Sequence, residues 1–503
     1  MIITDVKPIK LQFWPKNPPR DGLAAIPTRD VFLVQIETDE GISGIGEGFA
    51  LGSLESLAVL TTETLRPLLI GQNPLMIEAL WNRMYLNTAR YGRRGIMMAA
   101  ISAIDIALWD ILGKKAGMPV YQLLGAAKDS LIPYASAGYY MEGKGIPELQ
   151  AECLGYVDMG FKAIKIKVGG APVEEDIARV HGVREAIGPN IALGIDANNA
   201  WDYPTALKMA RACEKEDILF FEEPMSTDFP EDCARLAAHT DVSIAGYETL
   251  LTRYGMKDFI VRNAVDIVQA DAIWTGGITE ARRVGMIAGT WGKKVIPHFS
   301  ASMVSLAANL SFGQSLYNTE YMEYTLDENP LRSELCTESI VMKDGVVQQV
   351  DTPQHLYDLP CNLFVAGFMG SPQMNFLDAK VKVNGNDVTL TVGKYNMKLP
   401  ASKAKAVIDG GYDGKTVVMG IRPENLSDHP DDLAKSNAIF KAKVNVYELL
   451  GAEVFLYFDV NETPITARVD PKTTARPGSE VEFAIDTDKV HVFDKETEKT
   501  ICN

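Results

Sequence analysis

Charged residues lie at the ends of a series of short apolar runs in this sequence. The positions are Lys165 and Lys167 in AIKIKV, Asp196 in LGIDANN, Glu222 in LFFEEP, Glu248 in IAGYE, Asp271 in DIVQAD and His298 in KVIPH. Carboxylates together with lysine and histidine bases in one cavity could hold a divalent cation and remove a proton from carbon. That chemistry requires a fold that brings these distant positions together.

The spacing of the apolar runs predicts such a fold. Runs lie near residues 134, 163, 193, 219, 244, 267, 294 and 320. Roughly two dozen to thirty residues separate neighbouring runs, enough for a turn, an amphipathic helix and a return turn. Eight such βα units close a TIM-like barrel whose strand ends meet at one mouth. We therefore predict a (β/α) barrel catalytic domain over residues 131–335.

Three carboxylates end successive predicted strands. Asp196, Glu222 and Glu248 would place oxygen ligands side by side at the barrel mouth. Such ligands suit Mg²⁺, which retains some of its water. Acidic residues also begin βα loops as helix N-caps, and this is the alternative for any one of the three. Three in succession favour a Mg²⁺ site.

Basic groups complete the predicted site. Lys165 and Lys167 are two residues apart, so both point to the same face of a strand, and burying them unpaired under helices would be costly. We expect them inside the barrel mouth, with a solvated surface pair as the alternative. His298 and Asp271 end neighbouring predicted strands, where the carboxylate can fix the imidazole tautomer. A structural histidine is the alternative there.

The sequence pattern divides the chain into four regions. Residues 1–130 predict an α+β capping domain, with strands on either side of a long Pro- and Gly-rich loop, followed by helices. The barrel follows, and its βα rhythm stops near Leu331. Residues 336–370 form a junction, and residues 371–503 show the short alternating strands of a small all-β domain. The predicted fold class is α/β, a capped TIM-like barrel with an added β domain.

Composition argues against several functions. The chain has 503 residues, a net charge of −17 and no concentrated basic run, which argues against a nucleic-acid partner. Six scattered cysteines without CxxC spacing indicate a reduced, cytoplasmic protein. The most lipid-like stretch, residues 95–113, contains Asp105 and Asp110, so we expect a buried helix and no membrane insertion.

Taken together in this order, the motifs of residues 1 to about 335 resemble the mandelate racemase subgroup of the enolase superfamily. The resemblance implies roles for the strand-end residues: Mg²⁺ ligands at Asp196, Glu222 and Glu248, bases at Lys167 and His298 on opposite faces of the substrate, an orienting carboxylate at Asp271, and a substrate-carboxylate contact at Lys165.

A last carboxylate is expected at the eighth strand. In the family this group lies opposite the metal and donates a hydrogen bond to the intermediate, and the segment YMEY resembles its position, so we choose Glu323. Glu320 is the alternative, because residues three apart cannot both face inward on a regular strand. We assign Glu320 and Asn198 to substrate binding.

The capping domain is expected to select the substrate. Residues 14–29 and 47–53 would close over the bound acid and set which one fits. Arg20 and Arg29 could pair with a second carboxylate of the substrate, and exposed loop charges are the alternative.

The resemblance implies removal of the proton next to a carboxylate through an enediolate. Members that resemble this chain are mostly acid sugar dehydratases, so we predict a Mg²⁺-dependent sugar acid dehydratase, acting as a homo-oligomer. Bases on both faces also permit a racemase or epimerase of a 2-hydroxy acid, in which the proton returns on the other face.

The region from about Ser339 resembles a different protein. It is similar to the end of the nucleotide-binding domain of sugar-importing ABC transporter ATPases and to their TOBE regulatory domain, with VVMGIRPENL at 417–426 as the marker. The ATPase is not implied, because DGGYDGKT has Asp409 where the phosphate loop needs glycine. A third hypothesis is therefore a regulatory or sugar-binding protein with an inert barrel that contacts a transporter ATPase.

Overall fold

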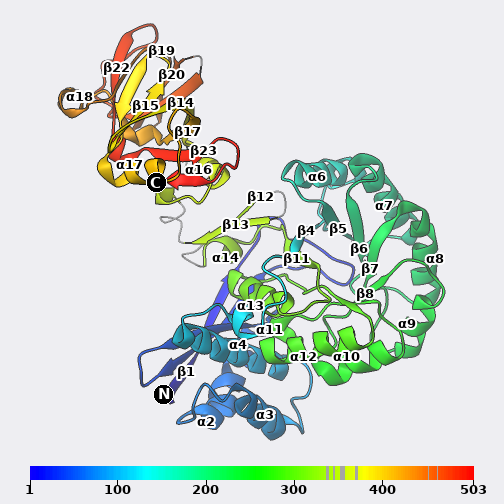
Figure 1. Cartoon of the computed structure of the whole chain (residues 1–503). Helices are drawn as coiled ribbons and strands as arrows, with labels where there is room; N and C mark the ends of the chain where they lie inside the picture. Colours follow the sequence, from blue (N-terminus) through cyan, green and yellow to red (C-terminus); the bar gives the residue numbers. More distant parts are fainter. Residues whose placement is uncertain (336–338, 344–345, 352–356, 369–371, 451–452, 462) are drawn as a thin grey trace. The chain divides into compact units, whose positions relative to one another are not determined.

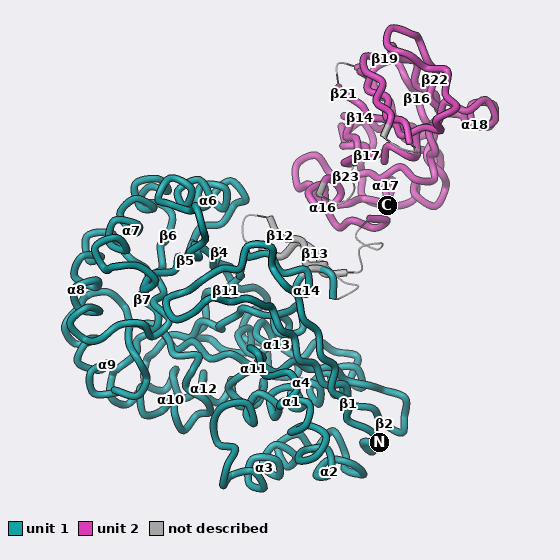
Figure 2. Tube along the Cα trace, turned by 180° about the vertical axis from the view of Figure 1, so that it is seen from behind, with its two compact units in different colours: residues 1–336, 344–346 teal, residues 337–343, 347–503 magenta. Residues whose placement is uncertain are grey.

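The computed structural model describes residues 1–335, 339–343, 346–351, 357–368, 372–450, 453–461 and 463–503. The chain forms two compact units, coloured separately in Figure 2. Unit 1 comprises Met1–Cys336 with Asp344–Val346, and unit 2 comprises Thr337–Lys343 with Val347–Asn503.

Unit 1 begins with an antiparallel sheet in the order β1 (Ile3–Phe13), β2 (Arg29–Thr38), β3 (Ser43–Gly48). The helical part of this cap comprises α1 (Leu54–Val59), a π-helical turn (Leu60–Leu65), α2 (Arg66–Leu69), α3 (Ile77–Thr88), α4 (Ile96–Ala116) and α5 (Val120–Leu123). Helix α4 packs directly on β3, because a Cβ added to Gly46 would lie 2.0 Å from the carbonyl oxygen of Ala103. Only glycine permits this approach.

Helix α4 contains the lipid-like stretch of the sequence. By length and composition it could cross a membrane, but 78% of its most apolar window is buried in the structure. Asp105 accepts hydrogen bonds from the backbone and the hydroxyl of Thr279. These contacts make α4 a core helix at the junction of cap and barrel.

The barrel follows the cap. Its parallel strands are β4 (Ile132–Ala137), β5 (Ala163–Lys167), β6 (Ala192–Asp196), β7 (Ile218–Glu222), β8 (Ile244–Gly246), β9 (Ile267–Val268), β10 (Lys294–Val295) and β11 (Tyr321–Thr325). They run in sequence order around the sheet, with β11 beside β4. A bridge between Val295 and Thr319 joins β10 to the segment that leads into β11, which closes the barrel. The predicted eight-stranded barrel is confirmed.

Helices cover the outside of the strands (Figure 1). They are α6 (Ile146–Asp158), α7 (Val173–Ile187), α8 (Tyr203–Cys213), α9 (Pro230–Ala237), α10 (Thr252–Val261), α12 (Gly277–Thr290) and α13 (Met303–Gln314), with the short helices α11 (Ala272–Thr275) and α14 (Pro330–Ser333). An apolar cluster that includes Tyr134, Phe220 and Ile267 packs inside the barrel. The strand ends are therefore left to carry polar groups.

Unit 2 is dominated by two β-sheets. Its paired strands β12 (Ser339–Lys343) and β13 (Val346–Asp351) precede α16 (Leu363–Phe368). The six-stranded sheet comprises β14 (Asn375–Asn384), β15 (Asp387–Val392), β16 (Tyr395–Lys398), β17 (Thr416–Ile421), β23 (His491–Asp494) and β24 (Thr500–Cys502). The five-stranded sheet comprises β18 (Leu426–Ser427), β19 (Ile439–Leu450), β20 (Glu453–Val460), β21 (Thr463–Val469) and β22 (Glu480–Ile485).

The two larger sheets of unit 2 share its main apolar core among the described residues. Leu377, Val417, Phe440 and Phe483 belong to it, and every member lies between residues 377 and 492. Helices α17 (Ala401–Asp409) and α18 (Pro430–Lys435) complete the unit. The predicted all-β C-terminal domain is confirmed.

Candidate active site

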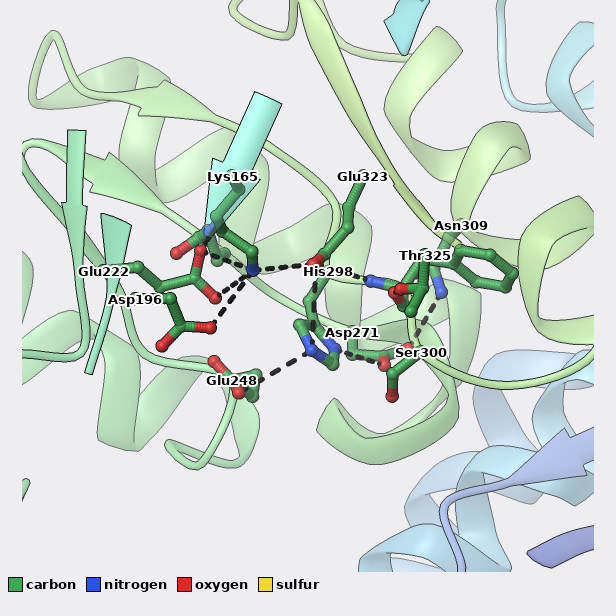
Figure 3. A network of polar contacts seen from close by, with 12 residues as sticks. Lys165, Asp196, Glu222, Glu248, Asp271, His298, Ser300, Asn309, Glu323 and Thr325 are labelled. Carbon is green, nitrogen blue, oxygen red and sulfur yellow. Dashed lines mark hydrogen bonds and ion pairs between the residues drawn. The ribbon is translucent and has the colours of Figure 1, made fainter. Parts of the chain in front are cut away.

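Lys165 lies at the centre of a buried ionic cluster (Figure 3). Its ammonium nitrogen is 2.8 Å from each carboxylate oxygen of Glu222 and 3.2 Å from an oxygen of Asp196. Glu323, from β11, approaches the same nitrogen to 2.6 Å. All these side chains are buried, and their negative charges keep the pKa of Lys165 well above its ordinary value although burial alone would lower it.

Strand register aligns Lys167 with two of the carboxylates. Across β5, β6 and β7, Lys167 is paired with Asp196, and Asp196 with Glu222. The nitrogen of Lys167 lies 2.5 Å from Asp196. Although burial alone would raise the pKa of Asp196, the ammonium groups of Lys167 and Lys165 lower it. Both lysines face the barrel interior, as strand alternation requires for residues two apart.

For three carboxylates of the cluster, burial raises the pKa by more than the nearby cations lower it. Burial and the nearby charge of Asp196 raise the pKa of Glu222 to about 8. Burial also raises the pKa of Glu248, and one of its oxygens, Oε2, is buried without a hydrogen-bond partner. The adjacent Glu223 accepts hydrogen bonds from Asn199 and Thr249, and burial raises its pKa as well.

The excess of negative charge fits a divalent cation. The cluster contains six buried carboxylates and three basic groups: Asp196, Glu222, Glu223, Glu248, Asp271 and Glu323 against Lys165, Lys167 and His298. Isolated buried charges are costly unless they are paired or bind metal. Among the described residues, no three His, Cys, Asp or Glu side chains are placed so that they could hold a metal ion as they stand, and the Lys165 nitrogen contacts both Asp196 and Glu222. The hard oxygen donors and the orphan oxygen of Glu248 match the ligands that Mg²⁺ prefers.

His298 is oriented by a chain of hydrogen bonds. Its Nδ1 is 2.9 Å from an oxygen of Asp271, whose other oxygen accepts from the side-chain amide of Asn309 at 2.9 Å. Asn309 lies on α13 and accepts from the backbone of Ala272. Burial would lower the pKa of His298, but Glu248, Glu323 and Asp271 raise it well above its ordinary value. The Nε2 atom, 3.7 Å from Glu248, faces the cluster.

Glu323 connects Lys165 with the histidine. Its second oxygen accepts the backbone N–H of Phe299 at 3.0 Å and lies 3.8 Å from Nε2 of His298. Burial alone would raise the pKa of Glu323, but Lys165 and His298 lower it to about 2. Glu323 therefore belongs to the ionic cluster, through its contacts with Lys165 and His298.

Glu320 does not join the cluster. It precedes β11, its exposed side chain lies 3.9 Å from Lys294 at the start of β10, and its backbone oxygen accepts from Ile132 at the start of β4. The amino ends of parallel strands lie at the end of the barrel opposite the mouth. Glu320 therefore lies away from the site to which we assigned it.

A cavity of about 260 Å³ opens beside the cluster and is lined by both cap and barrel residues. Lys167, Glu248 and His298 border it from the barrel, and Asn198 borders it from the loop after β6. Asn198 has a left-handed backbone with φ 45°, and its side-chain oxygen is buried without a hydrogen-bond partner. This unsatisfied acceptor is available to a ligand hydroxyl.

The two loop arginines differ from each other. Arg20 is exposed, lies over the ring of Tyr140 and donates to the backbone of Gly170. Arg29 is 9% exposed and forms an ion pair with Asp327. The description of an exposed loop charge is therefore wrong for Arg29, because the cap sheet buries it at the cavity wall.

Sequence reasoning missed three polar residues of the site. Gln269 donates to Glu222 at 2.7 Å, Asn309 supports Asp271, and the ring of Tyr139 lies 5.4 Å from the nitrogen of Lys167. Gln269 lies within the run DIVQAD and directly follows β9, so its strand-end position could have been noticed. Asn309 lies within a helix and carries no comparable signal.

The fold and the site together define a class. A (β/α) barrel whose strand ends carry three carboxylates and two separated bases, with an α+β cap lining the same cavity, is an enolase-superfamily barrel. The chain belongs to the mandelate racemase / muconate lactonizing enzyme family of that superfamily. Residues 8–125 match the N-terminal domain of that family, and residues 148–353 match the enolase C-terminal domain-like family.

Individual relatives cover most of unit 1. The arabinonate dehydratase of Saccharolobus solfataricus is 42% identical over 367 residues, 72% of this chain and 98% of the relative. The L-talarate/galactarate dehydratase of Salmonella typhimurium is 32% identical, over 63% of this chain and 77% of the relative. A racemase structure from Streptomyces coelicolor A3(2), with bound magnesium, matches with a TM-score of 0.64 and 27% identity, over 70% of this chain and 96% of that one.

The C-terminal unit matches other families. Residues 370–426 match the MalK OB fold domain, and residues 437–492 match the TOBE domain. The chain therefore joins an enolase-superfamily fold to the TOBE type of domain that the segment VVMGIRPENL predicts.

Proposed function

We propose that this protein is a Mg²⁺-dependent sugar acid dehydratase, a hydro-lyase. The observation that carries the proposal is that Lys167, Glu248 and His298, from three separate parts of the barrel, line one cavity. Dehydratases of sugar acids among the relatives, with 42% identity for the arabinonate enzyme, support the substrate class.

The residues have distinct roles in the proposal. Asp196, Glu222 and Glu248 would hold Mg²⁺, which when bound would supply positive charge to stabilise an enediolate. Lys165 donates a hydrogen bond to the substrate carboxylate. These groups hold the acid with its α carbon within the cavity that Lys167 and His298 border.

Proton transfer follows from the positions of the two bases. Lys167 is an ammonium group beside Asp196 in this structure, so it must first lose a proton to solvent. As the amine it then takes the proton from the carbon next to the carboxylate, and the electron pair of the broken bond forms the enediolate. The β-hydroxyl then accepts a proton from the imidazolium of His298 and leaves as water. The resulting enol becomes a 2-keto acid by tautomerisation. Asp271 keeps Nε2 of His298 directed to the cavity, because it occupies Nδ1.

Exchange of the α proton tests these roles. With Mg²⁺ in deuterated water, Lys167→Ala should reduce deuterium incorporation and 2-keto acid formation by at least about 10²-fold, the usual contribution of a general base. His298→Asn should reduce 2-keto acid formation by a similar factor. Product formation is measured with a panel of sugar acids, and incorporation by proton NMR.

Glu320→Gln is the matched control. This glutamate is exposed and lies at the opposite end of β11, so its substitution should leave both rates within about twofold, as surface changes usually do. Full exchange in Lys167→Ala together with full 2-keto acid formation in His298→Asn would refute the proposal.

The racemase alternative is favoured by one observation, namely that Lys167 at the end of β5 and His298 in the loop after β10 border the same cavity. It is distinguished by product: an isomerised acid without 2-keto acid would replace dehydration. We also propose that the protein is cytoplasmic and homo-oligomeric and that unit 2 contacts a transporter ATPase, the last supported by the match to the MalK OB fold domain. Co-purification with such an ATPase, without Mg²⁺-dependent turnover, would favour the regulatory hypothesis.

A further inference from the structure

The cavity has a reactive side and a cap side. The reactive side carries Lys167, Glu248 and His298 at the strand ends, and the cap side is formed by residues 21–30 and 49–51. A sugar acid whose carboxylate binds at the reactive side must extend its other end toward the cap. Charges on the cap side therefore decide which terminal group is accepted.

Arg29 is the one arginine among the described residues that line the cavity. Its charge is already paired with Asp327, which follows β11, and Asp327 also accepts from Arg332 at 2.7 Å. The side chains of Arg29 and Asp327 are 10% and 6% exposed, so the pair is largely withdrawn from water. The pair carries no net charge to attract a ligand carboxylate, although Nε of Arg29 is buried without a hydrogen-bond partner among the described residues.

Two other cap residues that line the cavity are acidic. Asp30 accepts from the side-chain amide of Gln12 at 2.8 Å and from the backbone of Gly52 at 2.7 Å. Asp21 accepts from the backbone of Leu23 and Ala24. All these donors are neutral amides, so they orient the carboxylates without cancelling their charge. The cap side is consequently net negative.

We propose that the site takes aldonic acids, which end in a hydroxymethyl group, and rejects aldaric acids, which end in a second carboxylate. The inference rests on the proposed function and deepens it by naming the substrate class. A second carboxylate would face Asp30 and Asp21 and would be repelled. A terminal hydroxyl can instead donate a hydrogen bond to Asp30, because an ionised carboxylate is an acceptor only.

The substitution Asp327→Asn tests the proposal by removing the charge that neutralises Arg29. The side-chain oxygen at position 327 can still accept a hydrogen bond from Arg332 in this variant. We expect the ratio of aldarate to aldonate affinity to rise by about tenfold or more, since removing one like or opposite charge changes such interactions by that order. Asp30→Asn is the second variant, and the same direction is expected because it removes a repelling charge without altering Arg29.

Affinity is measured by calorimetry with Mg²⁺ on a His298→Asn background, so that turnover does not interfere. The ligands are pairs of equal configuration, such as galactonate with galactarate and arabinonate with arabinarate. Asp387→Asn is the matched control, because this aspartate also pairs with a basic residue, Lys398 at 2.8 Å, but lies in unit 2. It should leave the ratio unchanged.

The outcomes separate this inference from the proposed function. Three results would overturn the inference. The His298→Asn protein could bind aldarates more tightly than aldonates, or it could bind neither class. The third is an unchanged affinity ratio in both Asp327→Asn and Asp30→Asn. Selective aldonate binding that shifts in these variants supports it even when the unaltered enzyme forms no 2-keto acid. That last result would refute only the dehydratase assignment.

Discussion

Asn309 shows how a residue outside the cavity can control one inside it. Its amide nitrogen donates to Asp271, and its oxygen accepts the backbone N–H of Ala272. Asp271 in turn holds Nδ1 of His298 at 2.9 Å. The imidazole is therefore positioned by a neutral side chain two hydrogen bonds away.

Replacing Asn309 should affect catalysis more than binding. In Asn309→Ala the carboxylate of Asp271 loses a donor and can rotate, so we expect kcat for dehydration to fall about tenfold or more, the usual effect of removing a supporting hydrogen bond. KM should change little, because Asn309 does not line the cavity. Steady-state kinetics provide the measurement, and Ser311→Ala on the exposed side of α13 is the control. A rise in KM at constant kcat would contradict the positioning role.

At the scale of elements, the cap and the barrel meet through Glu47. This residue of β3 is buried and accepts from the backbone of Ser302 and Ser305 at the start of α13, and from the hydroxyl of Ser302. A carboxylate is favourable at a helix N-terminus. Burial nevertheless raises the pKa of Glu47 to about 7.

The stability of this contact should depend on pH. The pKa of Glu47 is about 7 in the folded protein, whereas an ordinary glutamate, as in the unfolded chain, has a pKa of 4.5. Between these pH values the folded protein therefore holds a proton on Glu47 that the unfolded chain has lost. Stability from this group is present below pH 4.5 and is lost as pH rises to about 7, by about 3 kcal/mol at most. The Tm of Glu47→Gln relative to the unaltered protein should therefore increase from pH 5 to pH 7.5 in thermal scans. A pH-independent difference would show that Glu47 ionises as an ordinary glutamate.

The existence of the barrel strands was easier to predict from the sequence than the residues at which they begin. The βα rhythm identified the eight strands, because a strand buried on both faces is a continuous apolar run. The strand-end residues followed from the same rhythm. Glu320 was misplaced because its position depends on where β11 begins, and β11 starts one residue later, at Tyr321. Local pattern does not set such a boundary.

Long-range pairs could not be predicted in this way. The burial of Arg29 depends on Asp327, almost three hundred residues further along the chain. The support of Asp271 by Asn309 depends on how α13 packs against α11. Both are consequences of tertiary packing, and neither residue type nor spacing signals them.

At the scale of the whole molecule, the two units have separate cores. The apolar core of unit 2 lies between residues 377 and 492, and all the candidate site residues lie in unit 1. The unit 1 residues form their own cap and barrel cores. Chemistry and the C-terminal domain are thus carried by different parts of the chain.

Removing the part of unit 2 that follows Asp351 should leave the chemistry intact. A chain ending after Asp351 retains the cap, the barrel and α14, so kcat/KM for dehydration should stay within about threefold of the full-length value, below the tenfold that corresponds to about 1.4 kcal/mol. The comparison uses purified full-length and shortened proteins at equal concentration. Soluble, folded but inactive shortened protein would show that unit 2 completes the site.

The way in which the barrel closes has a consequence for the evolution of this enzyme. Strands β5 and β6 are joined by a ladder without a register shift, whereas β10 meets the approach to β11 through the bridge of Val295 and Thr319. Beyond this bridge, Glu323 accepts the backbone N–H of Phe299, and the hydroxyl of Thr325 donates to the carbonyl oxygen of Phe299. A descendant enzyme with a wider pocket between His298 and Glu323 would therefore have to replace these contacts, while the carboxylates on β6 and β7 could keep their spacing.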